Sequence, residues 1–95
     1  MHYRITKVQH GPGKRDDIIA YLKTKDEDVI SIEGLQSVRM IALSETESIA
    51  ISKYENEQQL KMAEEKFKDI MSGMMPFMTA PPEINNGDEC WSVKK

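Results

Sequence analysis

Residues Ser48–Ala63, SIAISKYENEQQLKMA, decide how this chain is expected to fold. A short strand ends at Tyr54, and the start of a helix follows it directly, without a connecting loop. Asn56 is placed to accept backbone N–H groups of the first helical turn, and Gln59 stands three residues later, as in a capping box. Apolar positions such as Leu60 then recur at helical spacing. The stretch predicts a strand joined directly to a helix, which is information about fold and not about catalysis.

Two further strands are predicted upstream of this junction. Residues Leu35–Ser44, LQSVRMIALS, precede the strand Ser48–Tyr54, and the polar turn Glu45–Glu47 should join the two as an antiparallel hairpin. The first strand is His2–Gln9, HYRITKVQ, which Gly11-Pro12-Gly13 stops.

A helix is predicted from near Gly13, because Ile18, Ile19, Tyr21 and Leu22 form one apolar stripe. Two readings of its end are open. The helix continues to about Ile32 with Gly34 as its cap, or the β-branched residues from Val29 onward form an extended segment.

The second helix should run from Asn56 to a stop between Gly73 and Pro76. A turn at Asn86-Gly87 and a closing strand Glu89–Val93, ECWSV, follow. The order is strand, helix, strand, strand, helix, strand. It predicts one α+β domain over residues 1–95, a ferredoxin-like βαββαβ fold with an antiparallel sheet.

The strand Leu35–Ser44 is apolar on both faces. In an antiparallel sheet with one face exposed to solvent, apolar and polar residues should instead alternate along the strand. One face carries Val38, Met40 and Ala42, and the other carries Arg39, Ile41 and Leu43. Two helices cover only one face of such a sheet. We therefore expect the other face to pack on a second copy of the chain, giving a homodimer with a barrel-like interface.

Composition narrows the classes of partner. The chain has 95 residues, with 13 basic and 16 acidic side chains interspersed, so no extended positive surface for nucleic acid is expected. No apolar run approaches the roughly 20 residues that span a bilayer, and the N-terminus lacks the features of a signal peptide. With a single cysteine, Cys90, the expectation is a reduced, cytoplasmic protein that binds neither membranes nor nucleic acids.

The turn Gln9–Lys14, the lead-in Glu33-Gly34-Leu35 and the segment Lys53–Glu57 followed by Leu60 resemble the dimeric α/β-barrel superfamily, in particular small proteins similar to the antibiotic-biosynthesis monooxygenases. The resemblance implies a ferredoxin-like subunit in a dimeric barrel. Some members oxygenate quinol-like aromatic substrates without metal or organic cofactor, others degrade haem, and many have no assigned reaction. The haem-degrading members use an Asn in the first strand and a His from the second helix, both missing here, so no cofactor is expected.

A ligand would then bind between the sheet and the helices. The expected lining residues are Phe67, Met71 and Met74, with polar contacts from Tyr3, Arg4, Arg39, Tyr54 and Trp91. Each has a plainer interpretation: the methionines as core filling, Trp91 as core or dimer packing, and Arg39 as a dimer-interface ion pair. No catalytic residue is identified.

No metal site is expected, because His2 and His10 lie at opposite ends of one strand and are read as surface residues. Cys90 is read as a small buried hydrophobe.

Two functions fit this sequence. One is a cofactor-independent monooxygenase acting on an apolar aromatic, for which an open cavity with Arg or Tyr pointing inward would be required. The other is a non-catalytic ligand-binding or accessory dimer on the same scaffold.

Overall fold

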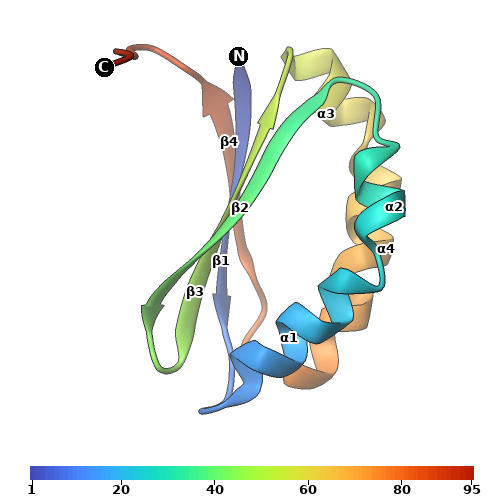
Figure 1. Ribbon diagram of the computed structural model, residues 1–95, viewed down its shortest axis with the longest axis vertical. Coiled ribbons are helices and arrows are strands. Elements are labelled where there is room, and N and C mark those ends of the chain that lie inside the picture. Colours follow the sequence, from blue (N-terminus) through green and yellow to red (C-terminus); the bar gives the residue numbers. More distant parts are fainter.

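A four-stranded antiparallel sheet carries all of the helices on one of its faces (Figure 1), in a computed structural model that describes residues 1–95. The elements in chain order are β1 His2–Gln9, α1 Lys14–Lys23, α2 Asp26–Ile30, β2 Leu35–Ser44, β3 Glu47–Tyr54, α3 Glu57–Met62, α4 Glu64–Met74, the 3₁₀ turn η1 Met75–Phe77, and β4 Glu83–Asp88. The strand order is β2-β3-β1-β4. This confirms the predicted ferredoxin-like α+β fold. No helix is both long enough and apolar enough to cross a membrane.

The strand-to-helix junction forms as predicted. β3 ends at Tyr54, and the backbone N–H of Gln59 donates to the Asn56 side-chain oxygen at 2.9 Å, which caps α3. The reciprocal half of the capping box is not made, because the side-chain oxygen of Gln59 is buried without a hydrogen-bond partner.

Both predicted helices are divided in two. α1 stops at Lys23, where the Thr24 hydroxyl donates to the carbonyl of Tyr21 at 2.6 Å, and α2 begins at Asp26. The segment to Ile30 is therefore neither one long helix nor an extended strand. The second helix breaks at Ala63, whose φ of −86° and ψ of 1° depart from helical values.

The predicted closing strand is wrong. β4 is Glu83–Asp88, so Asn86-Gly87 lies inside a strand instead of forming a turn. Antiparallel pairing with β1 overrides the local turn preference, and it places Asn86 opposite Arg4. Residues 89–95 lie outside the sheet. Trp91 is 78% exposed and Cys90 is also exposed, which corrects the expectation that this cysteine is buried.

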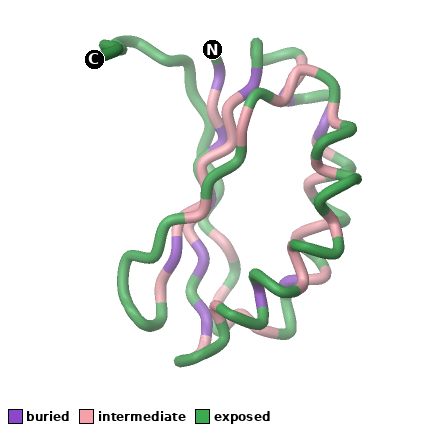
Figure 2. The backbone as a smooth tube through the Cα atoms, in the orientation of Figure 1, coloured by how far each residue is buried: buried purple, intermediate pink, exposed green.

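The core lies between the sheet and the helices (Figure 2). It consists of two small clusters: Val8, Ile18 and Met74 in one, and Tyr54, Leu60 and Ala63 in the other.

Gly73 sets the distance between α1 and α4. The Tyr21 hydroxyl lies over it and donates to the carbonyl of Ile70 at 2.9 Å. A Cβ atom at position 73 would lie 2.0 Å from that hydroxyl oxygen, so the contact requires glycine.

The opposite face of the sheet has no helix over it (Figure 1). Strand register brings Ile5 opposite Ile51 and Ile41 opposite Ile49. Ile41 is 44% exposed on this open face, whereas Val38 and Met40 of the same strand lie on the helix side and line the cavity there, although Val38 is itself 48% exposed. β2 is therefore apolar on both faces, as predicted.

Candidate functional site

An apolar cavity of about 100 Å³ lies between the sheet and the helices. Its lining residues are Thr6, Val8, Leu22, Val29, Ile32, Leu35, Val38, Met40, Ala50, Ser52, Tyr54, Phe67, Ile70, Met71 and Met74. Only three of these residues carry a polar group on the side chain, namely Thr6, Ser52 and Tyr54. The lining contains no carboxylate, histidine, lysine or cysteine, so the cavity can hold an apolar group but has no strong base of its own.

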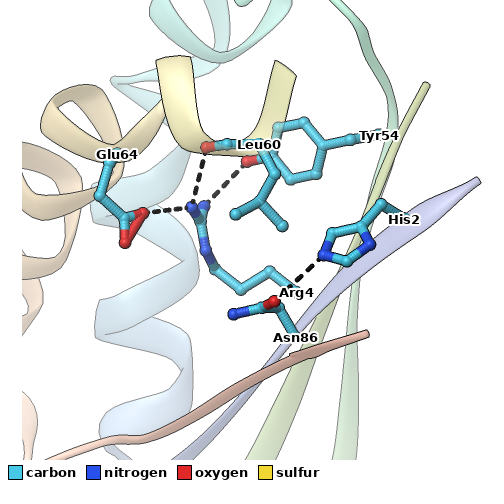
Figure 3. A network of polar contacts seen from close by, with 6 residues as sticks. All are labelled: His2, Arg4, Tyr54, Leu60, Glu64 and Asn86. Carbon is cyan, nitrogen blue, oxygen red and sulfur yellow. Dashed lines mark hydrogen bonds and ion pairs between the residues drawn. The ribbon is translucent and has the colours of Figure 1, made fainter. Parts of the chain in front are cut away.

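Tyr54 supplies a polar group that a buried arginine holds in place. Arg4 Nη1 donates to the Tyr54 hydroxyl oxygen at 2.9 Å (Figure 3). Arg4 is only 1% exposed and Tyr54 only 2%. Because this oxygen accepts from Arg4, the hydroxyl hydrogen remains available for donation to another group. Burial raises the pKa of Tyr54, although Arg4 opposes the shift. Tyr54 therefore stays protonated at neutral pH and keeps a hydrogen that it can donate.

Arg4 is committed to the protein. It also donates to Glu64 Oε2 at 2.6 Å and to the carbonyl of Leu60 at 3.4 Å. The centre of its guanidinium lies 3.9 Å from the centre of the Phe67 ring, which is a cation–π distance. Arg4 thus holds Tyr54 and Phe67 in place through contacts within the chain.

A second, open space of about 540 Å³, the outer cleft, is lined by residues of α1, α2 and β2. Its lining residues are Ile19, Leu22, Lys23, Asp26, Val29, Ile30, Leu35, Gln36, Ser37, Val38 and Met40. Five of them, Leu22, Val29, Leu35, Val38 and Met40, also line the inner cavity. The cavity and the cleft therefore lie next to each other and share part of their lining.

The sequence matches no protein-family model, and no curated protein matches it. Solved structures do match. A candidate antibiotic biosynthesis monooxygenase from Nitrosomonas europaea is 13% identical with a TM-score of 0.79, over 96% of this chain and 100% of that one. A monooxygenase of Streptomyces coelicolor, solved with the ligand nanaomycin D, is 14% identical with a TM-score of 0.76, over 99% and 91% of the two chains. A protein of unknown function from Nitrosomonas europaea is 10% identical with a TM-score of 0.77, over 99% and 93%.

The chain has the antibiotic biosynthesis monooxygenase-like fold. At these identities the likeness concerns the fold, so the activity has to be argued from the site.

Within this monooxygenase-like fold, four of the eight predicted ligand-binding residues line the cavity: Tyr54, Phe67, Met71 and Met74. Arg4 lies directly behind Tyr54 and Phe67.

The other three predicted residues lie away from the cavity. Side chains alternate along β1, so Tyr3 points to the opposite face from Arg4 and donates to Glu89 at 2.5 Å. Arg39 is exposed on the open sheet face, in register with Ile51, and forms no ion pair within this chain. Trp91 lies in the exposed segment beyond β4.

The expectation that both histidines are on the surface is wrong, since His2 and His10 are buried. The His2 ring contacts Asp88 Oδ1 at 2.6 Å and Asn86 Oδ1 at 3.0 Å, and the hydrogen bond to Asp88 raises its pKa against the opposing effect of burial. His10 Nε2 lies 3.0 Å from Ser48 Oγ at the other end of β1. Both histidines connect strands and turns. The alternation of side chains along the strand could have indicated this burial, because His2 and His10 fall on the same face of the strand as Arg4, Thr6 and Val8.

Proposed function

We propose that this protein binds a small quinol-like aromatic between its sheet and its helices and oxygenates it with O₂, without metal or organic cofactor. The observation that carries the proposal is Tyr54, a residue of the largely apolar cavity lining whose hydroxyl oxygen accepts a hydrogen bond from buried Arg4. The fold supports it, since the Streptomyces coelicolor protein with the same architecture is described as a monooxygenase.

The proposed reaction needs only the substrate and O₂. A quinol and O₂ give a hydroxyquinone and water: the quinol anion supplies the electrons, a C–O bond forms at a ring carbon, and the O–O bond breaks. The second oxygen atom leaves as water with the hydrogen from that carbon and a proton from solvent, which replaces the proton that the quinol released. No lining side chain is a strong base, so the quinol proton leaves to solvent during binding.

Tyr54 contributes by donating a hydrogen bond to the quinolate oxygen. In a cavity from which water is excluded, such a donor stabilises the anion more than the same bond does in water. Arg4 strengthens the donor, because a hydroxyl that accepts from a cation polarises its own O–H bond. The apolar lining also keeps water away from the peroxide intermediate.

We further propose that the working unit is a cytoplasmic homodimer formed through the open sheet face. Ile5, Ile41, Ile49 and Ile51 are neighbours there in the strand register, and no helix covers them. An isologous contact would bury this face on both copies at once.

The reaction is tested by incubating the protein with ¹⁸O₂ and a panel of hydroquinone, 2-alkylhydroquinones and 1,4-naphthohydroquinone, followed by mass spectrometry. We expect a product with one labelled oxygen, formed faster than the spontaneous oxidation. The Tyr54→Phe variant should lose about 10²-fold or more of the rate, as for other oxyanion donors. Labelled product at no more than the spontaneous rate for every compound would contradict the proposal.

The second candidate is a non-catalytic binding protein, and the absence of a base from the cavity lining favours it. In that case the same compounds should raise the melting temperature by binding the native state, while no labelled oxygen enters the product.

A further inference from the structure

The inner cavity is too small for the proposed substrate as it stands. Its volume is about 100 Å³, whereas an apolar protein cavity that binds benzene measures about 150 Å³. A quinol ring needs more room than benzene, because it carries two hydroxyl groups. The binding space must therefore extend beyond the cavity, and the surrounding walls indicate where.

The inner cavity shares part of its wall with the outer cleft. Leu22, Val29, Leu35, Val38 and Met40 line both spaces, so a small movement of these side chains joins the cavity to a cleft of about 540 Å³. In the cleft, Ile19 and Ile30 add apolar surface next to the shared residues. The rest of the cleft lining is polar and includes Lys23 and Gln36.

One element of this wall, α2, is loosely attached. α2 has no buried residue, and its ion pair to α4 is a long contact of 3.9 Å between Asp28 and Lys66. β2 has a register shift between Leu35 and Ser37, so Gln36 has no partner in the strand ladder at the edge of the cleft. Segments with few buried contacts open at low free-energy cost. The α2–β2 gap is therefore the side on which the cavity can widen.

We propose that the substrate is a quinol that carries an apolar substituent of several carbons, with its ring beside Tyr54 and the substituent passing between α2 and β2 into the outer cleft. This inference rests on the proposed function and adds the shape of the ligand to it. Ile19 and Ile30, which line the cleft but not the inner cavity, are then residues that determine specificity. They would contact the substituent and leave the ring untouched.

The test is isothermal titration calorimetry without oxygen, using hydroquinone and its 2-methyl, 2-butyl and 2-hexyl derivatives. Full burial of a methylene is worth about 0.8 kcal/mol, which is about fourfold in affinity, and burial in an open cleft gives somewhat less. We expect affinity for the wild-type protein to rise about twofold to fourfold per methylene. In the double variant Ile19→Asn, Ile30→Asn the affinity for hydroquinone should stay unchanged and the gain with chain length should disappear.

The matched control is Ile84→Asn, which replaces another exposed isoleucine on β4, outside both spaces, and should keep the full gain. Binding of hydroquinone with no gain along the series would overturn the inference and leave the proposed function standing. A gain that survives in the double variant would also overturn it, because the chain then binds elsewhere. If no compound binds at all, both the inference and the proposed function fail.

Discussion

Replacing Tyr54 by phenylalanine removes one oxygen atom from the site and keeps the ring that packs in the core. Arg4 Nη1 then loses the acceptor at 2.9 Å in a position that is 1% exposed. A hydrogen bond to a charged group contributes about 1.5–3 kcal/mol. Arg4 keeps its bonds to Glu64 and Leu60, so we expect a loss near 2 kcal/mol, or about 8–16 °C in melting temperature for a domain of this size.

The same substitution should weaken binding. If Tyr54 donates to the quinol oxygen, its loss lowers the affinity for hydroquinone by a further 1.5–3 kcal/mol, which is about tenfold to a hundredfold. Calorimetry without oxygen measures this directly. Thermal unfolding of the free variant measures the stability cost separately.

The matched control is Tyr21→Phe, which also removes a hydroxyl with a protein partner, the carbonyl of Ile70, but at a residue outside the cavity lining. It should cost about 1 kcal/mol of stability and leave the affinity unchanged. Equal affinities for the wild-type protein and Tyr54→Phe would refute the assigned role of this tyrosine. So would equal losses of affinity in the two variants.

Three other predictions concern the rest of the molecule. Ile41→Glu should convert the dimer to a monomer in analytical ultracentrifugation, because it places an unpaired charge in an apolar interface; a wild-type protein that is monomeric at micromolar concentration would rule out the dimer. Asn56→Ala should lower the free energy of unfolding by about 1 kcal/mol in urea titrations, and no change would mean that the cap is not formed in solution. The pKa of His2 is raised above its ordinary value of 6.5 by Asp88, so its contribution to stability is complete below about pH 6.5 and is lost as pH rises through the folded-state pKa. Asp88→Asn should remove that pH dependence, and an unchanged profile would contradict the assignment.

Local patterns were sufficient to predict the order of elements. The Asn56 cap, the bounds of β2 and the apolar character of both β2 faces are properties of neighbouring residues, and the structure confirms them. The closing strand failed because local turn preference at Asn86-Gly87 competes with pairing to β1, which depends on residues more than eighty positions away. The residues around Asn86-Gly87 do not indicate that this segment pairs with β1.

The site was partly predictable for the same reason. Tyr54, Phe67, Met71 and Met74 follow from the faces of β3 and α4 once the fold is assumed. The outer cleft could not be anticipated, because it depends on the break between α1 and α2 at Thr24-Lys25. The prediction of Trp91 as a site residue depends on a closing strand at Glu89–Val93, whereas β4 ends at Asp88 and Trp91 is exposed.

The central claim is that an aromatic ring binds between the sheet and the helices with its oxygen against Tyr54. A crystal structure of the protein with 2-hexylhydroquinone, grown without oxygen, tests it most directly. We predict the ring in the cavity with one hydroxyl oxygen about 2.6–3.2 Å from the Tyr54 oxygen. A cavity still filled by the side chains of Met71, Met74 and Phe67, with the compound absent or bound on the outside of the protein, would contradict the account.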